Sequence, residues 1–140
     1  MAQLTLLLAI HNHQPDGNFG HVFQQAYDDC YRPLVDTLLE FPTVKVILGH
    51  MGHCNVVYIN GAIDVAERNA NVYLETSGMP MPTKIREAVE RVGPDRVLFG
   101  SDIPFHHPKI EIDRVHLSGL SPELVERVLS TNARALFLGE

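Results

Sequence analysis

The chain has 140 residues, of which 45% are hydrophobic and 20% are charged, and its formal net charge is −6. These are the proportions of one ordinary globular domain, and the lack of a basic stripe disfavours a nucleic-acid partner. The most apolar run, residues 4–10, is too short to cross a membrane and lacks the basic start of a signal peptide. We therefore expect a cytoplasmic protein without a membrane partner, in which Cys30 and Cys54 are reduced thiols.

Four short apolar runs, each followed at once by polar residues, predict four β-strands, at residues 4–10, 44–48, 71–75 and 96–99. Apolar residues spaced three or four apart predict helices at residues 21–38, 55–69, 83–91, 109–114 and 121–137. Strands joined through helices run parallel, so we expect an α/β fold of four consecutive βα units, half of a (β/α)8 barrel. One domain is expected over residues 1–140, with the first unit in 1–43 and three further units in 44–140.

The helical patterns also predict which side chains are buried. Ile59, Ile63 and Ala66 are expected to face inward from the helix at 55–69. Thr83 is expected to cap the next helix, and Ser121, followed by Pro122, to cap the last one. In these two helices the positions expected to be buried are Ile85, Ala88, Val89, Val92, Leu124, Val128, Leu129, Ala133 and Leu136.

Histidines and one aspartate follow the predicted strands at their carboxyl ends, the edge where βα proteins build their active sites. His11 and His13 are two residues apart, so they share a face and could chelate a divalent metal. Asp102 follows a buried strand and a glycine, where a carboxylate is costly to bury alone. It could be a metal ligand, a base that holds a water, or a cap of the next turn.

His50 follows the second predicted strand. It could be a general base or a group that polarises the substrate, or it could simply hydrogen-bond a loop carbonyl. Candidate substrate-binding residues are His53, Glu75, His106 and His107. Their ordinary alternatives are solvated loop histidines and, for Glu75, an ion pair with a nearby arginine.

Histidine and carboxylate ligands suit zinc, iron or manganese, of which zinc is the expected metal. Such a metal lowers the pKa of a water toward ~7. The sequence contains neither a G-x-S-x-G motif nor a glycine-rich phosphate loop, which disfavours a serine nucleophile or a nucleotide substrate.

Two family resemblances cover different parts of the chain. The stretches FPTVKVILGHMGH, AIDVAERNANVYLETSG, IREAVERVGPDRVLFGSDIPF and LSPELVERVLSTNARALFLG, within residues 41–139, resemble the C-terminal half of amidohydrolase-related (amidohydrolase 2) metal-dependent hydrolases. That resemblance implies a (β/α)8 barrel in which a metal-activated water attacks an amide, ester or lactone, or assists a decarboxylation. It also implies that Asp102 is a metal ligand or proton acceptor and His50 a ligand or catalytic base.

The stretch IHNHQPDGNFGHVFQQAYDDCYRPLVDTLLEFP, within residues 4–46, instead resembles the start of glycoside hydrolase family 57. The chain thus resembles a chimera whose join is at FPTVKV. The join is chemically sensible because His11 and His13 fall where amidohydrolases carry their own first-strand H-x-H. The amidohydrolase strands two to five, one of which carries a further ligand histidine, have no counterpart here.

In a sheet of order 1-2-3-4, the first and last strands are three spacings of ~4.8 Å apart, about 14 Å. His11 and His13 then cannot share a metal with Asp102 of the same chain, so we predict a homodimer through edge strands that completes the site twice. The first functional hypothesis is a metal-dependent hydrolase acting on a small molecule. The alternatives are a non-catalytic, designed or recombined half-barrel scaffold with inherited histidines, and a carbohydrate-binding or glycoside hydrolase-like protein.

Overall fold

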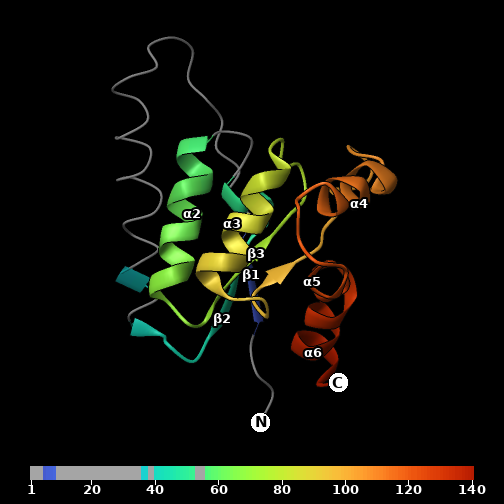
Figure 1. Ribbon diagram of the computed structural model, residues 1–140. Helices are drawn as coiled ribbons and strands as arrows, with labels where there is room; N and C mark the ends of the chain where they lie inside the picture. The colour runs from blue at the N-terminus through green and yellow to red at the C-terminus, as the bar shows by residue number, and fades with distance from the viewer. Residues whose placement is uncertain (1–4, 9–35, 38–39, 53–55) are drawn as a thin grey trace.

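The computed structural model describes residues 5–8, 36–37, 40–52 and 56–140 (Figure 1). Some of the sequence predictions concern residues outside these ranges. They are the predictions for His11, His13, His53, Cys30 and Cys54, and for most of the helix at 21–38. The division of the chain into one first unit and three further units stays a prediction.

A parallel four-stranded sheet organises the fold, and its strands follow one another in the order β1-β2-β3-β4. Their bounds are Thr5–Leu8, Lys45–Leu48, Val72–Glu75 and Val97–Leu98. The register pairs Leu8 with Leu48, and Leu48 with Leu74. The sequence prediction of four parallel strands in chain order is confirmed, although β2, β3 and β4 are each shorter than the run that predicts them.

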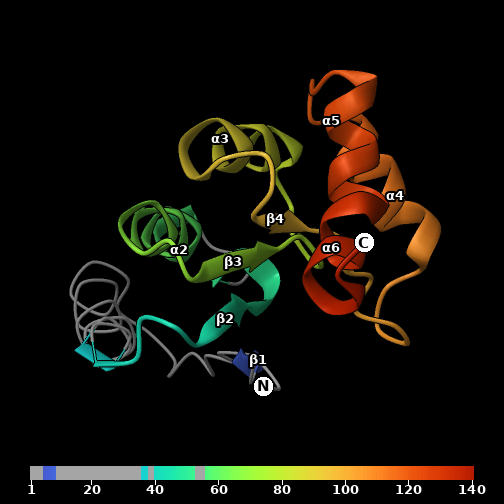
Figure 2. The ribbon, with the colours of Figure 1, turned by 90° about the horizontal axis from the view of Figure 1, so that it is seen from below.

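Helices α2 (Val56–Arg68) and α3 (Pro82–Val92) cover one face of the sheet. Helix α4 (Pro108–His116) lies in the connection after β4. The chain ends in one continuous helical segment made of α5 (Pro122–Glu126), the π-helical turn η2 (Arg127–Thr131) and α6 (Asn132–Leu138), which lies beside β4 (Figure 2).

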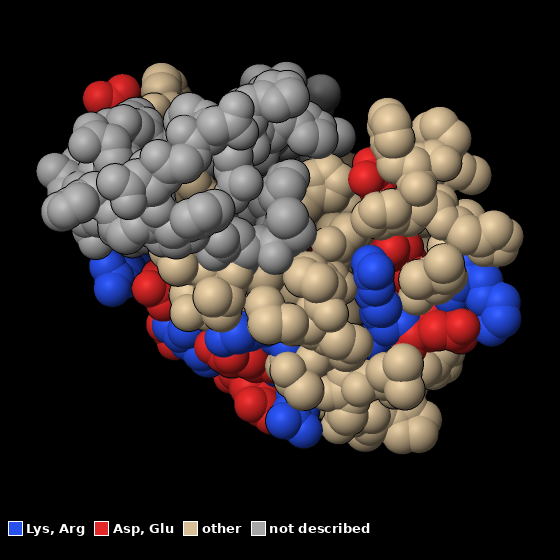
Figure 3. Space-filling model, turned by 90° about the horizontal axis from the view of Figure 1, so that it is seen from above, with Lys and Arg blue, Asp and Glu red and all other residues tan. Residues whose placement is uncertain are grey.

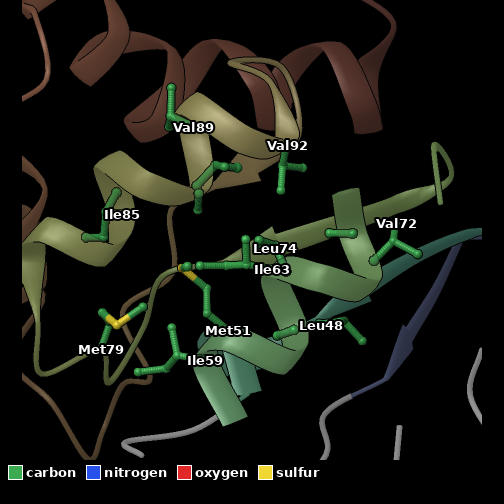
Figure 4. Packing of buried hydrophobic residues seen from close by; sticks show 14 of the residues in the cluster. Leu48, Met51, Ile59, Ile63, Val72, Leu74, Met79, Ile85, Val89 and Val92 are labelled. Atoms are coloured by element: carbon green, nitrogen blue, oxygen red, sulfur yellow. The ribbon is translucent and has the colours of Figure 1, made fainter. Parts of the chain in front are cut away.

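The core lies between the sheet and the helices α2 and α3 (Figure 4). Strand side chains alternate, so Leu48, Val72 and Leu74 point toward the helices and are almost fully buried. Ile59, Ile63 and Ala66 of α2 meet them, as predicted, with no exposed surface. From α3 come the predicted Ile85, Ala88, Val89 and Val92, all buried. Burying each large aliphatic side chain contributes about 1.5–3 kcal/mol, so this cluster is the main source of stability.

Arg96 fixes the amino-terminal edge of the sheet. Its Nη1 donates to the carbonyl oxygens of Ala66 (2.8 Å), Asn69 (2.8 Å) and Val72 (3.1 Å), and its Nη2 to that of Val92 (2.6 Å). Burial lowers the pKa of Arg96, but a guanidinium stays charged at any pH at which proteins are folded. One side chain therefore joins the ends of α2 and α3 to the start of β3.

The prediction that Thr83 caps α3 is wrong. The helix begins one residue earlier, at Pro82, and its N-cap is Met81, which makes no capping bond through its side chain. Proline fits the first helical position because its φ is already helical and its missing N–H has no partner to bond there. The helix ends at Val92, and its C-cap is Gly93, whose φ is 104°.

The last helix starts at the predicted cap, since Ser121 Oγ accepts from the Leu124 N–H at 3.4 Å. Its predicted buried face is only partly right, because Val128 is buried while Leu124, Leu129, Ala133 and Leu136 are half-buried. The π-helical turn η2 adds one residue to a turn and rotates the helix that follows. Asn132 therefore faces inward in place of a hydrophobic residue.

This π-helical turn also closes the outer edge of β4. The Asn132 N–H bonds to the Arg127 carbonyl, five residues back, which leaves the Val128 carbonyl to accept from the Phe99 N–H at 2.9 Å. Asn132 Nδ2 donates to the Val97 carbonyl (2.8 Å) and to the Pro94 carbonyl (2.6 Å). The outward-facing backbone groups of β4, which could otherwise hydrogen-bond to another strand, are thus bonded to the chain's own helix.

Among the described residues, no helix is both long and apolar enough to span a membrane.

Asn132→Ala should destabilise the fold by about 2 kcal/mol, because two carbonyl oxygens at the β4 edge lose their donor. Urea unfolding monitored by circular dichroism measures this change. Thr131→Ala, on the exposed side of the same helix, is the matched control and should shift stability by less than about 0.5 kcal/mol. Equal stability of the two variants would contradict the edge-closing role of Asn132.

Candidate functional site

The candidate site lies at the carboxyl ends of the strands, the upper edge in Figure 1. Three polar segments meet there: the turn η1 (Gly49–Gly52) after β2, the residues after β3, and the segment after β4. Figure 3 looks down on this edge, where uncharged residues make up most of the described surface and acidic and basic side chains lie next to one another.

Two of the predicted site residues have unusual backbone conformations. In the described part of the chain, the only non-glycine residues with positive φ are His50 (58°), Met51 (43°) and Asp102 (50°). This left-handed conformation is costly for residues with a Cβ, and it persists where the surroundings enforce it, often at functional sites. Met51 has no exposed surface, so its burial in the core holds the η1 turn in place.

The His50 ring is fixed by Ser77. Its Nδ1 lies 2.9 Å from Ser77 Oγ and 3.1 Å from the Ser77 carbonyl oxygen. The Ser77 hydroxyl gives its own hydrogen to Glu75 Oε2 (2.8 Å), so towards the ring both serine oxygens act as acceptors. Nδ1 must then carry the proton, and in neutral His50 the basic nitrogen is Nε2. The bond to a loop carbonyl is therefore present, and it prepares the ring for acid–base or ligand chemistry.

Glu75 holds this arrangement together from within β3. Its Oε2 accepts from the His50 N–H (3.0 Å), and its Oε1 accepts from the Ser77 N–H (2.6 Å). The expected alternative of an arginine partner is wrong, since in the described part of the chain this carboxylate accepts from backbone N–H groups and a hydroxyl. Gly100 makes room for it, because a Cβ there would lie 1.6 Å from Glu75 Oε1.

Asp102 is half-buried after β4. Its carbonyl accepts from the N–H groups of Phe105 (2.8 Å) and His106 (3.2 Å). Within the described residues its carboxylate makes no hydrogen bond or ion pair. The alternative of a cap of the next turn is not supported, because the N–H groups of Phe105 and His106 in that turn bond to the Asp102 carbonyl and not to its carboxylate. An unpaired carboxylate at this edge could therefore act as a ligand for a cation.

The two loop histidines differ in their surroundings. His107 is exposed, and its Nδ1 accepts from the Lys109 N–H at 3.2 Å as the cap of α4. His106 is half-buried, and its Nδ1 lies 2.9 Å from Glu111 Oε1, although this close contact lacks the alignment of a hydrogen bond. His106 therefore belongs to the site, whereas the geometry of His107 is that of a capping residue.

Four site residues were not predicted from the sequence: Ser77, Gly78, Gly100 and Glu111. Glu111 is buried on α4 (2% exposed), next to Val115 on the same helical face. A glutamate at an apolar position of a helical stripe is the sequence signal that could have identified it. Ser77 and Gly78 follow Glu75 directly, but their partners come from other segments.

A metal site is only partly represented in the structure. In the described ranges no group of three His, Cys, Asp or Glu side chains is close enough to hold an ion, and His11 and His13 lie outside those ranges. The donors that are described, the imidazole of His50 and the unpaired carboxylate of Asp102, match the preferences of zinc, iron and manganese.

Comparisons with known proteins place the chain. A family model described as "Amidohydrolase" matches residues 29–138. The gamma-resorcylate decarboxylase of Polaromonas sp. is 30% identical over 116 residues, covering 70% of this chain and 35% of that protein. The alpha-amylase of Pyrococcus furiosus is 48% identical over 50 residues, covering 36% of this chain and 8% of that protein. Both predicted resemblances, and hence the chimeric character of the sequence, are confirmed.

Solved structures agree on the fold. An uncharacterised TIM-barrel protein of Bordetella bronchiseptica superposes with a TM-score of 0.72 at 22% identity, covering 96% of this chain and 45% of that one. A dihydroxybenzoic acid decarboxylase of Polaromonas sp. with bound manganese gives 0.64 at 21% identity (93% and 49%). An amidohydrolase of Burkholderia multivorans with bound zinc gives 0.61 at 15% identity (80% and 49%). The chain thus spans about half the length of these barrels and about a third or less of the curated relatives named above, and the predicted partial barrel is confirmed.

Gly100→Ala should destabilise the fold strongly, by about 2–4 kcal/mol, because the new methyl group overlaps the Glu75 carboxylate. The cost should shrink in a Glu75→Ala background, which removes the overlapping atoms. A double-mutant cycle from urea unfolding gives this coupling. Additive effects of the two substitutions would show that Gly100 is not needed for the fit of Glu75.

Proposed function

Since the chain belongs to the amidohydrolase family, we propose that it binds a divalent metal at the carboxyl edge of its sheet and hydrolyses an amide, ester or lactone-like bond of a small molecule. The observation that carries this proposal is the pair His50 and Asp102, each held in a left-handed backbone conformation after β2 and β4. Both lie at the edge where βα folds place their chemistry.

We propose His11, His13 and Asp102 as the metal ligands. Supporting this set are the unpaired carboxylate of Asp102 and the bound manganese and zinc of two solved relatives. Zinc is our first choice, and iron or manganese suits the same donors. Such a cation, when bound, supplies Lewis acidity and lowers the pKa of a water toward ~7.

His50 is the proposed base. Its Nδ1 proton is fixed by Ser77, so its Nε2 can take a proton from the attacking water and return it to the leaving group. Glu75 positions this ring through the His50 N–H and the Ser77 hydroxyl and is not itself a substrate contact. Among the four predicted substrate-binding residues, we retain His53 and His106 for contact with the substrate.

The observed strand order sets a condition on this site. β1 and β4 are three strand spacings apart, about 14 Å. His11 and His13 of one chain would therefore meet Asp102 of a second chain, in a homodimer with two equivalent sites. Because the outward groups of Val97 and Phe99 are bonded to the last helix, we propose that the subunits meet through their rims and not by pairing at the β4 backbone.

A second candidate is non-oxidative decarboxylation of a hydroxybenzoate. It is favoured by the similarity to gamma-resorcylate decarboxylase over 70% of the chain, and it needs the same metal and a proton donor in place of a base. A carbohydrate substrate has support from the matches to alpha-amylases and a 4-alpha-glucanotransferase, which span 36% to 100% of this chain but only 8% to 19% of those proteins. A scaffold that binds no metal is the outcome expected if the proposal fails.

Asp102→Asn should lower zinc affinity at least about tenfold, because a neutral amide replaces the charged ligand. Metal content after reconstitution and dialysis, measured by mass spectrometry, reports the loss. Asp95→Asn is the matched control, an exposed aspartate at the amino end of the same strand. A wild-type chain that retains no metal would support the scaffold alternative, and equal metal content in both variants would remove Asp102 from the site.

Mixing two variants tests the shared site. The double variant His11→Ala/His13→Ala and the variant Asp102→Asn should each bind zinc at least about tenfold more weakly when pure, so that little metal remains after dialysis. A mixed dimer combines the intact His11 and His13 of one subunit with the intact Asp102 of the other, so mixing should restore metal to one of its two sites. Native mass spectrometry counts the ions for each dimer. If the mixture stays metal-free while wild-type protein binds zinc, the sites are not shared between subunits.

A further inference from the structure

We propose that Glu111 is a positioning residue, which holds His106 beside His50 at the rim. This inference rests on the proposed function, because it assumes that His50 and His106 contact the same substrate. The contacts of Glu111 do not depend on that function.

Glu111 stands out because its carboxylate is buried yet joins three segments. Its side chain is 1% exposed. Its Oε2 accepts from the Gly78 N–H (3.2 Å), in the turn after β3. Its Oε1 lies 2.7 Å from Arg114 Nη1 on the same helix and 2.9 Å from His106 Nδ1, in the loop after β4. A buried carboxylate persists only with such partners, so its neighbours are fixed relative to one another.

The two histidines meet at Gly78. A Cβ built on this glycine would lie 3.3 Å from His106 Cε1 and 3.5 Å from His50 Nδ1. The φ of Gly78 is also positive, at 67°, so this position favours glycine for its backbone as well as for its space. The imidazoles of His50 and His106 therefore both border the space that a side chain at position 78 would fill, and the Gly78 N–H donates to Glu111.

This arrangement gives each ring its own carboxylate support. Glu75 acts on His50 through Ser77, and Glu111 lies directly against the Nδ1 side of His106. Arg114 offsets the charge of Glu111, so the glutamate serves to hold the ring and is not a free base. Two rings positioned independently at one edge can serve one substrate, with His50 as the base and His106 as the second contact.

Glu111→Gln tests this role with little change in shape. The amide has one oxygen in place of two. If that oxygen stays with Arg114, the NH₂ group faces the Gly78 N–H and two donors oppose each other. Asp113→Asn is the matched control, since it also neutralises a carboxylate on α4, but one that is half exposed and pairs with Lys109.

The first measurement is NMR of the Gly78 amide and of the ring C–H groups of His106 and His50. In Glu111→Gln the Gly78 amide resonance should move upfield and the His106 ring resonance should move with it. In Asp113→Asn both should stay in place. Unchanged Gly78 and His106 resonances in Glu111→Gln, whatever happens to its melting temperature, would overturn the proposal.

The second measurement is kinetic and uses the zinc-loaded protein with the substrate on which the wild type acts. Glu111→Gln should lower kcat about tenfold or more. His106→Ala should lower it as well, and the double variant should be no worse than His106→Ala, because Glu111 acts through that ring. Additive losses would overturn the proposal. If the wild type has no activity while the NMR shifts are as expected, the proposed function fails and the positioning role of Glu111 stands.

Discussion

The Glu75 carboxylate is the interaction on which the candidate site depends. It lies at the end of the central strand β3, where it accepts hydrogen bonds from the backbone of the η1 turn and from Ser77. Through the Ser77 hydroxyl it also settles which nitrogen of His50 carries the proton. The segment after β4 needs a glycine at position 100, because a Cβ there would overlap this carboxylate. One half-buried carboxylate thus fixes the backbone, the ring tautomer and the packing of three neighbouring segments.

The two ends of the sheet are fixed by groups of opposite charge. At the amino end Arg96 donates to carbonyl oxygens of α2, α3 and β3. At the carboxyl end Glu75 and Glu111 accept from N–H groups of the loops. The first arrangement stabilises the fold, and the second also leaves imidazole rings in defined places. This difference explains why the charged groups at the rim, and not Arg96, are candidates for chemistry.

Much of the fold could be predicted from the sequence because it depends on local patterns. The order of strands followed from apolar runs, and the inward faces of α2 and α3 followed from helical spacing. The π-helical turn at Arg127–Thr131 could not be predicted in this way, since it is stabilised by bonds from Phe99 and Asn132 to groups distant in sequence. For the same reason His50 and Asp102 were found, each after its own strand, while Ser77 and Glu111 were missed. Their importance lies in partners more than 25 residues away.

The closed edge of β4 limits how two copies of the chain could form the proposed metal site. In the described part of the chain, Val97 and Phe99 are bonded to the last helix, so this edge has little tendency to add a strand. β1 lies at the opposite edge, next to β2, with Leu8 level with Leu48. β1 is therefore three strand spacings away from β4, which Asp102 follows. The proposed metal ligands His11 and His13 on one side, and Asp102 on the other, thus follow strands at opposite edges of this sheet. The proposed homodimer would join them through contact between the rims of two copies, which leaves the last helix in place.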